Sequence, residues 1–195
     1  VLFSPLFLIA ALMVKLTSPG PVIFRQTRVG INRKPFEMYK FRSMRVETES
    51  IVRMAGAEDD RCTSVGHFLR KYSIDELPQL ICILSGDMSI VGPRPERPEI
   101  AMEYEKELPE FALRLQAKAG LTGYAQVYGK YNTTPYDKLQ MDLMYIAHPS
   151  IIEDFKIVFA TVKILFMPES TEGIAEGATT ALGHEKTNHN DRMTV

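Results

Sequence analysis

An apolar run at the start of the chain most limits the folds that the chain can adopt. Residues 1–14, VLFSPLFLIAALMV, are apolar apart from Ser4, and Lys15 closes the run before the turn-rich TSPGP. The run is too short to cross a bilayer, which takes about 20 apolar residues. Pro5 would kink a helix that contained it in its interior. Two structures stay open, a buried core helix and a segment that dips into a membrane.

The composition is that of one globular domain with a core of its own. The 195 residues are 45% hydrophobic and carry a formal net charge of −1, which by itself indicates no charged partner. No nucleic-acid reading motif is present, and we expect no nucleic acid as a partner. Cys62 and Cys82 lack metal-ligand spacing, which favours reduced thiols over a disulfide framework.

Positive charge is concentrated directly after the apolar run. Between residues 15 and 45 the only acid is Glu37, and the bases are Lys15, Arg25, Arg28, Arg33, Lys34, Lys40, Arg42 and Arg45. The alternating VIFRQTRVG and FEMYKFRSM, separated by INRKP, predict a short hairpin. The charges form either an ordinary solvated face or a surface that binds lipid headgroups or phosphate ligands. Near an anionic bilayer each base would contribute about 1 kcal/mol of attraction.

Two adjacent carboxylates, Asp75 and Glu76, precede the apolar stretch LICIL. Proline is tolerated only in the first turn of a helix, so Pro78 predicts a helix that begins close to Asp75. As a cap and a first-turn acid, the two would stabilise that helix by about 1 kcal/mol each without any chemistry. They could equally hold a divalent cation or attack phosphorus, with Arg70 and Lys71 supplying positive charge.

The next segment, SGDMSIVGPRP, predicts a turn, a short buried strand over residues 88–91 and a rigid loop. Prolines on both sides restrict the backbone around Arg94. A guanidinium held in this way suits bidentate phosphate binding. The alternative is a surface turn with an incidental arginine.

The C-terminal third predicts several helices. Residues 98–120 indicate two short helices divided at Pro109, with Gly120 as a stop, and AGLTGYAQVYG indicates a loop and a short strand. Thr134, Pro135 and Asp137 form a strong helix start. In that helix Asp142 lies beside an apolar stripe of Leu139, Leu143 and Ile146, so it either points towards a cleft or forms an exposed ion pair.

A last helix begins at Ser150. Its apolar residues recur at helical spacing and predict a face that packs on the core or lies in a membrane interface: Ile152, Phe155, Phe159, Val162 and Phe166. From residue 169 onward the chain is rich in Gly, Thr and charge, which predicts a disordered tail over residues 169–195.

Six short motifs in this order resemble the bacterial sugar transferase family, the monotopic polyprenyl-phosphate phosphoglycosyl transferases that include the catalytic domains of exopolysaccharide and O-antigen initiating enzymes. The resemblance covers about residues 1–168. The motifs are SP at residues 4–5, YKFRSM at 39–44, LRKYSIDELPQL at 69–80, GDMSIVGPRP at 86–95, AGLTGYAQV at 119–127 and MDLMYI at 141–146.

The resemblance implies a mixed α/β fold, mostly helical, with a re-entrant membrane helix, a short antiparallel β-hairpin and several amphipathic helices packed at the membrane interface. Residues 1–20 would be the second half of the re-entrant helix, whose first half lies upstream, and Ser4 and Pro5 would mark its break. Residues 21–168 would form the cytosolic catalytic domain.

The resemblance also implies an activity, the transfer of a sugar-1-phosphate from a UDP-sugar to undecaprenyl phosphate with release of UMP. Asp75 would be the nucleophile that forms a covalent phosphosugar intermediate. Glu76 would be its partner in the dyad, and both would hold Mg²⁺. Asp142 would be a further active-site acid, and the substrate phosphates would be held by Lys40, Arg70 and Arg94.

The expected partners are undecaprenyl phosphate, a UDP-sugar and membrane lipid, at the cytoplasmic face of the bacterial inner membrane, and a homodimer is left open. Two other functions remain as alternatives. A non-catalytic module could bind anionic lipid through the basic residues 15–45, and a nucleotide-sugar hydrolase would release sugar phosphate to water. The sequence does not identify the sugar.

Overall fold

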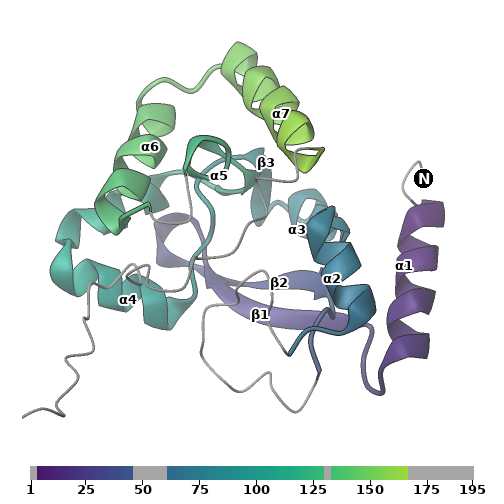
Figure 1. Cartoon of the computed structure of the whole chain (residues 1–195). Helices are drawn as coiled ribbons and strands as arrows, with labels where there is room; N and C mark the ends of the chain where they lie inside the picture. Colours follow the sequence, from purple (N-terminus) through teal and green to yellow (C-terminus); the bar gives the residue numbers. More distant parts are fainter. Residues whose placement is uncertain (1–3, 46–60, 130–132, 167–195) are drawn as a thin grey trace, which may run out of the picture.

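The computed structural model describes residues 4–45, 61–129 and 133–166. These residues form a mixed α/β fold that is mostly helical, with two small two-stranded sheets among the helices. In Figure 1, α1 and α2 lie to the right of the β1–β2 hairpin, α4 and α6 lie to its left, and α7 lies at the top. The predicted fold class is confirmed at this level. The tail over residues 169–195 lies outside the described residues.

The first helix, α1 (Ser4–Thr17), buries one narrow stripe of its surface. Ala10 and Val14 pack against Phe41 and Leu69. Ser4 and Pro5 are its first two residues, where a proline costs no hydrogen bond. Most of the remaining apolar side chains are exposed, so α1 is not a fully buried core helix.

The predicted hairpin is present. β1 (Ile23–Val29) pairs antiparallel with β2 (Pro35–Phe41), and a 3-10 turn, η1 (Ile31–Arg33), connects the strands. Phe36 and Met38, on one face of β2, join a core cluster with Cys82. The hairpin therefore forms the platform on which the middle of the chain packs.

The middle of the chain contains short elements. They are α2 (Ser64–Lys71), the 3-10 turn η3 (Ile74–Glu76), α3 (Gln79–Leu84) and β3 (Met88–Val91). The prediction of one helix that begins near Asp75 is wrong, because α3 begins at Gln79. Pro78 has no N–H to donate to Ile74 O, and Leu77 N donates to that carbonyl instead, at 3.1 Å. The result is a separate 3-10 turn.

A crossover of two helical segments connects β3 to its parallel partner β4 (Ala119–Thr122). The segments are α4 (Pro98–Glu107) and the 3-10 helix η4 (Pro109–Gln116), divided at Pro109 as predicted. Gly120 does not end a helix, which corrects the prediction. It lies in β4, where a Cβ atom would come within 2.1 Å of Gly92 N.

Three helices complete the described chain, namely α5 (Tyr124–Tyr128), α6 (Pro135–Ala147) and α7 (Ile151–Leu165). α5 occupies a segment that was expected to be a loop. The predicted start of α6 is confirmed, because Thr134 Oγ1 accepts a hydrogen bond from Asp137 N at 3.1 Å.

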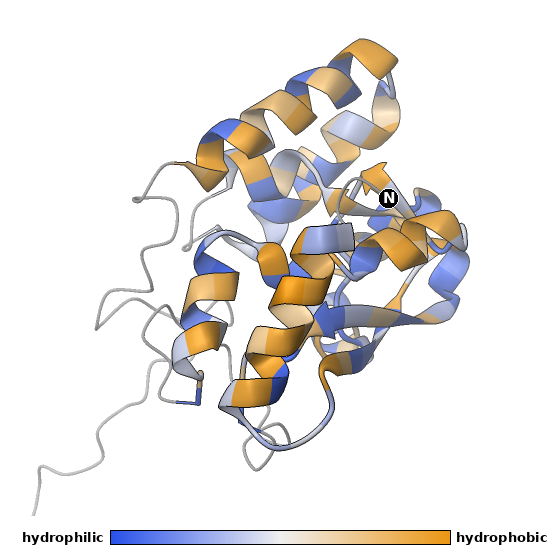
Figure 2. Ribbon diagram, turned by 90° about the vertical axis from the view of Figure 1, so that its right-hand side faces the viewer, coloured by the Kyte–Doolittle hydropathy of each residue, from blue (hydrophilic) through white to orange (hydrophobic). Residues whose placement is uncertain are grey.

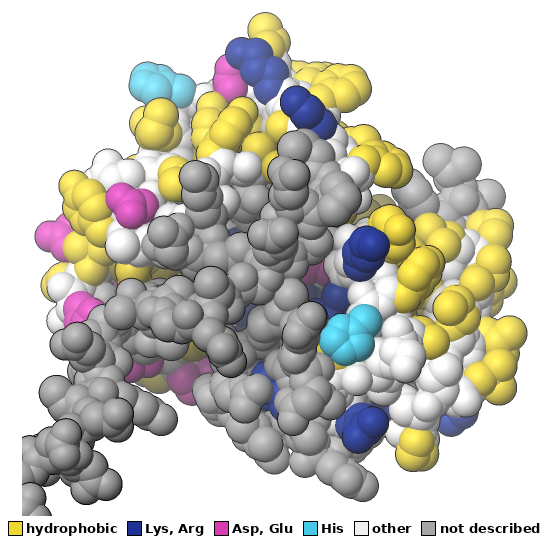
Figure 3. All heavy atoms as spheres, viewed as in Figure 1, with side chains coloured by type: hydrophobic (Ala, Val, Ile, Leu, Met, Phe, Trp, Pro, Cys, Tyr) yellow, Lys and Arg dark blue, Asp and Glu magenta, His cyan; other side chains and the backbone are white. Residues whose placement is uncertain are grey.

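α1 and α7 carry apolar faces that the described chain does not cover. On α7 only Ile157 is buried, and the predicted stripe faces outward, with Phe159 72% exposed. Figure 2 shows apolar turns on the side of the molecule that carries α1, and Figure 3 shows apolar side chains gathered over α1 and α7. No helix within the described ranges has the length and apolar character needed to cross a membrane. Because the apolar stripe of α7 is exposed, it does not pack on the core.

Candidate active site

Asp75 and Glu76 lie side by side in the 3-10 turn η3, which follows a strained residue. Ser73 has φ 51° and ψ 23°, in the left-handed region that residues other than glycine rarely adopt. Successive residues of a 3-10 turn point about 120° apart. The two carboxylates consequently meet different surroundings. Asp75 is 7% exposed, whereas Glu76 is half-buried.

The turn is anchored to the hairpin by its buried face. One face of η3 and α3 is buried at a helix-like spacing and packs on β2. Its residues are Asp75, Pro78, Gln79 and Cys82. The Cys82 thiol donates to Glu37 O at 3.4 Å. The dyad is therefore held on a strand rather than on a free loop.

Glu76 joins two cations from separate parts of the chain. Its Oε1 atom accepts hydrogen bonds from Lys40 Nζ at 2.7 Å and from Arg94 Nη2 at 2.8 Å. Burial alone would raise the pKa of Glu76, but Arg94 and Lys40 outweigh it and hold the pKa well below its usual range. Glu76 thus stays ionised and fixes both cations beside Asp75.

Asp75 is in the opposite situation. Within the described part of the chain its carboxylate makes no hydrogen bond or ion pair. Burial raises the pKa of Asp75, an effect that the charges of Lys40, Arg70 and Arg94 oppose without cancelling. A desolvated carboxylate with no partner, surrounded by positive charge, is the state expected of a nucleophile that attacks an anionic substrate.

Arg70 approaches from the last turn of α2. Its Nη1 atom donates to Cys62 Sγ at 3.0 Å, so it acts on Asp75 through its charge rather than by contact. α2 packs closely on the backbone before it, since a Cβ atom on Gly66 would lie 1.9 Å from Ser43 O. The structure therefore gathers all three predicted phosphate-binding cations around the dyad.

Arg94 is not an incidental surface arginine. It lies in the loop after β3, and its side chain is 39% exposed while it contacts Glu76. The preceding Gly92 has φ 159°, and a Cβ atom there would lie 2.4 Å from Lys118 O. The loop therefore passes too close to its neighbour for any other residue at that position.

Asp142 is placed differently from both of its predicted settings. It is 1% exposed and pairs with Arg114, with Oδ2 accepting from Nη2 at 2.6 Å and from Nε at 2.9 Å. The prediction of an exposed ion pair is therefore wrong, because the pair is buried. The charged neighbours that act on Asp142 are Arg114, Lys138 and Glu96, none of them part of the dyad.

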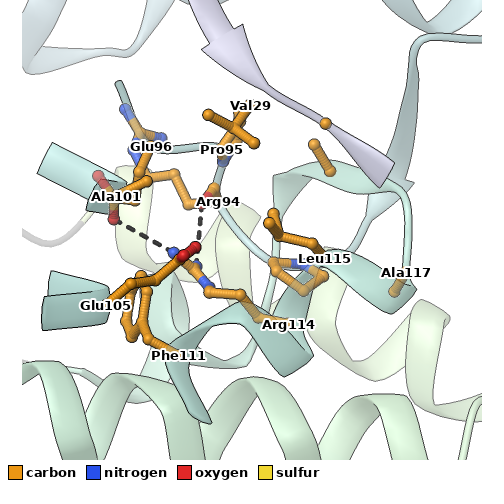
Figure 4. Close-up of a pocket in the computed structure, with 13 residues that line it drawn as sticks. Val29, Arg94, Pro95, Glu96, Ala101, Glu105, Phe111, Arg114, Leu115 and Ala117 are labelled. Carbon is orange, nitrogen blue, oxygen red and sulfur yellow. Dashed lines mark hydrogen bonds and ion pairs between the residues drawn. The ribbon is translucent and has the colours of Figure 1, made fainter. Parts of the chain in front are cut away.

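A small pocket lies beside the Arg94 loop (Figure 4). Val29, Glu96, Phe111, Arg114 and Ala119 are among its lining residues. Its cavity of about 20 Å³ has room for a single water molecule. This pocket is a gap behind the loop and is too small for a nucleotide sugar.

Comparison with known proteins supports the family suggested by the motifs. A sequence model described as bacterial sugar transferase matches residues 1–168. The chain belongs to the bacterial sugar transferase family. Its match to the family includes the dyad, the three cations and Asp142.

Several members of the bacterial sugar transferase family are similar to this chain. A UDP-glucose:undecaprenyl-phosphate glucose-1-phosphate transferase of Escherichia coli is 48% identical over 83% of this chain and 36% of the relative. A protein of that name in Caulobacter vibrioides is 46% identical over 87% of this chain and 66% of the relative. A UDP-N-acetylgalactosamine-undecaprenyl-phosphate N-acetylgalactosaminephosphotransferase of Aeromonas hydrophila is 42% identical, over 84% and 40%. The chain thus spans between about a third and two thirds of these relatives.

Several residues that hold the Arg94 loop were not predicted from the sequence. Arg28 Nη1 donates to Pro95 O at 3.0 Å, and Lys138 Nζ donates to Glu96 Oε1 at 2.6 Å. Arg114 is 3% exposed. An arginine at a buried position of an otherwise apolar segment is a signal for such a role, since arginine is rarely buried without a partner.

Proposed function

We propose that this chain is the catalytic part of a membrane-bound phosphoglycosyl transferase. It would move a sugar-1-phosphate from a UDP-sugar to undecaprenyl phosphate and release UMP, in the first membrane step of exopolysaccharide or related glycan synthesis. The observation that carries the proposal is the contrast within the dyad. Asp75 is buried and has no hydrogen-bond or ion-pair partner among the described residues, whereas Glu76 holds Lys40 and Arg94. The names of the relatives support the substrates.

The proposed reaction consists of two displacements at one phosphorus atom. A carboxylate oxygen of Asp75 attacks the phosphorus that carries the sugar, and the bond from that phosphorus to the oxygen of the departing UMP breaks. An oxygen of undecaprenyl phosphate then attacks the same phosphorus. The aspartyl O–P bond breaks, the Asp75 carboxylate is regenerated, and the lipid carries the sugar through a diphosphate.

Lys40, Arg70 and Arg94 would neutralise the diphosphate as it approaches. Two anions would otherwise repel each other, because the nucleophile and the substrate are both negatively charged. Lys40 and Arg94 are already fixed by Glu76. The cost of ordering these long side chains is therefore met in folding rather than at the moment of reaction.

Mg²⁺ fits this donor set. Glu76 uses Oε1 for both of its ion pairs, so its Oε2 atom is not used by either cation and could bind the ion together with the Asp75 carboxylate. Among the described residues no three His, Cys, Asp or Glu side chains converge, so the diphosphate would complete the shell, as is usual for Mg²⁺. Asp75 and Glu76 would hold the ion, which when bound would neutralise charge on the transferred and departing phosphates.

The exposed apolar faces of α1 and α7 would place the protein at the cytoplasmic face of the bacterial inner membrane. α1 would be part of a re-entrant helix with its break at Ser4 and Pro5, and α7 would lie in the interface. The exposed Leu8, Ile9 and Leu12 of α1 support this arrangement. Residues 21–168 would form the cytosolic catalytic domain.

The decisive experiment is a search for the covalent intermediate. The protein, solubilised in detergent, is incubated with Mg²⁺ and UDP-glucose or UDP-N-acetylgalactosamine, without lipid acceptor, and its intact mass is measured. We expect one sugar phosphate on the wild type and none on Asp75→Asn. The control is Asp87→Asn, which changes an acid that accepts a hydrogen bond from Ser85 at the surface, and it should carry the sugar phosphate as the wild type does. With undecaprenyl phosphate present, we expect Asp75→Asn to reduce UMP release by about 10³-fold or more.

Three other outcomes would contradict the proposal. Full turnover by Asp75→Asn would exclude the covalent role of this residue. Release of UMP and sugar phosphate to water at a rate that ignores the lipid would indicate a hydrolase. Vesicle binding that is indifferent to Asp75 and Glu76, with no turnover of any UDP-sugar, would indicate a lipid-binding module.

A further inference from the structure

Four successive backbone carbonyls of the Arg94 loop are held by hydrogen bonds from other elements. Pro93 O accepts from Gly120 N at 2.9 Å, and Arg94 O accepts from Arg114 Nη2 at 2.9 Å. Pro95 O accepts from Arg28 Nη1 at 3.0 Å, and Glu96 O accepts from Val29 N at 3.0 Å. Prolines have no N–H, so this loop can be held chiefly through its carbonyl groups.

The donor to the Arg94 carbonyl is Arg114, which several other contacts hold in place. Arg114 uses three nitrogens at once, since Nε and Nη2 pair with Asp142 and Nη1 lies 3.4 Å from Glu96 Oε1. Its guanidinium also lies 4.7 Å from the centre of the Phe111 ring. In Figure 4 the Arg114 side chain points from η4 towards the loop that carries Arg94 and Glu96.

These contacts form a continuous connection from α6 to the dyad. Asp142 orients Arg114, Arg114 holds the Arg94 backbone, and the Arg94 side chain reaches Glu76 Oε1 at 2.8 Å. Asp142, together with Glu96, also provides the negative charge that balances Arg114, a buried cation close to Arg94. The Arg94 carbonyl is the point at which this connection enters the loop.

We propose that Arg114 and Asp142 are a positioning pair that sets the reach of the Arg94 guanidinium towards Glu76. Neither residue touches the substrate. Under the proposed function, on which this part of the inference rests, the pair determines how well Arg94 binds the donor diphosphate. Asp142 is accordingly a positioning residue rather than an acid at the reacting atoms.

The kinetic test uses Asp142→Asn and Arg114→Lys. Asparagine keeps the shape of Asp142 without its charge. Lysine has one nitrogen in place of the three of Arg114, so it loses the Nε contact to Asp142 and the Nη1 contact to Glu96, and with them the fixed orientation of the donor to the Arg94 carbonyl. We expect kcat/KM for the UDP-sugar to fall about 10- to 100-fold, mainly through KM, at temperatures where the variants remain folded. The KM for undecaprenyl phosphate should stay within about twofold.

Tyr145→Phe is the matched control. Tyr145 lies on the same helix as Asp142, and the substitution removes a hydrogen bond of 2.8 Å to Asp154 in α7, which is not among the contacts that connect Asp142 to Arg94. We expect it to lower the unfolding midpoint with little effect on kcat/KM. If Asp142→Asn fails to fold, the apolar pair Arg114→Met with Asp142→Leu replaces it, since such swaps of buried ion pairs are often neutral or stabilising.

A second measurement does not depend on the proposed function. The coupling between Arg94 and Glu76 is measured by thermal unfolding of Arg94→Gln, Glu76→Gln and the double variant, in the wild type and in Arg114→Lys. We expect the coupling to fall to less than half in Arg114→Lys. An unchanged coupling would overturn the proposal. So would folded variants of Arg114 or Asp142 that are less stable than the wild type but keep its KM for the UDP-sugar. If the wild type transfers no sugar phosphate, the proposed function fails, and the coupling measurement alone tests the positioning pair.

Discussion

At the scale of single residues, two neighbouring carboxylates acquire opposite properties. Asp75 is buried and has no partner in the part of the chain that the structure describes, and burial raises the pKa of its carboxyl. Glu76 is held by Arg94 and Lys40, which lower its pKa despite burial. Pairs of acids whose surroundings separate their pKa values are typical of sites in which one reacts and the other supports.

Replacing Asp75 should stabilise the protein. A raised pKa means that the folded state favours the protonated form of Asp75. The stability that Asp75 contributes is therefore fully present below the pKa of the unfolded state, and it is lost as the pH rises through the pKa of the folded state. At neutral pH we expect Asp75→Asn to raise the unfolding midpoint by roughly 2–4 °C, the shift that about 1 kcal/mol produces at this size. Thermal unfolding between pH 4 and 8 measures it, and an unchanged or lower midpoint contradicts the burial argument.

Replacing Glu76 should have the opposite effect. The pKa of Glu76 is lowered in the folded state. The stability that Glu76 contributes is therefore present above the pKa of the unfolded state, and it is lost as the pH falls through the pKa of the folded state. At neutral pH, Glu76→Gln removes the carboxylate that both Lys40 and Arg94 contact and should cost about 1–3 kcal/mol, the lower end being favoured by the partial exposure of Arg94.

The control for Glu76 is Glu153→Gln, which removes an exposed ion pair with Lys156 and keeps an amide oxygen that can accept from the Tyr124 hydroxyl. Both variants are compared with the wild type by urea unfolding at pH 7 and again at low pH. We expect the difference between wild type and Glu76→Gln to shrink in acid. Equal losses in the two variants at pH 7 would show that the contacts of Glu76 contribute no more than a surface pair.

At the scale of elements, α7 has two faces with different roles. Ile157 is fully buried, and Phe159 two positions later is 72% exposed. A helix that exposes several large apolar residues on one side needs a cover, and for this helix we propose the membrane interface. The two faces can therefore be tested separately.

Phe159→Asp should weaken binding to lipid vesicles several-fold while changing stability by no more than about 0.5 kcal/mol, as expected for an exposed position. Ile157→Ala should cost about 2–5 kcal/mol, because it opens a cavity. The folded fraction of Ile157→Ala should still bind vesicles. Co-sedimentation and thermal unfolding measure the two effects, and loss of stability in Phe159→Asp would mean that the residue packs on the protein.

At the scale of the whole molecule, half of the basic residues of the segment 15–45 are engaged by other parts of the protein. Lys40 pairs with Glu76, Arg28 and Arg42 bind backbone carbonyls of Pro95 and Ser18, and Arg33 pairs with Glu105. These charges stabilise the protein and its site. The other four bases, Lys15, Arg25, Lys34 and Arg45, are exposed, so the charge left for anionic lipid is about half of that in the sequence.

Membrane binding should therefore depend weakly on salt. Raising NaCl from about 0.1 M to about 1 M shortens the Debye length from about 10 Å to about 3 Å and screens charge attraction, but it leaves apolar burial intact. We expect partition onto vesicles that contain anionic lipid to change less than about threefold. A loss of several orders of magnitude would favour the lipid-binding module instead.

Local structure was predicted where local interactions decide it. The alternation of side chains predicted the hairpin, and Thr134 with Asp137 predicted the start of α6, because strand pleat and helix capping depend on residues a few positions apart. The motif words also identified the family and the residues near the dyad. The start of α3 was misjudged because Pro78 ends one pattern of hydrogen bonds and begins another.

Tertiary structure alone decided what each charge does. Lys40 and Glu76 are 36 positions apart, and Arg114 and Asp142 are 28 apart, so no local pattern relates them. The pKa of a carboxyl depends on its burial and on the charges that folding places around it. For the same reason the sequence could locate an apolar stripe on α7, whereas only the packing of the other elements determined that this stripe faces outward.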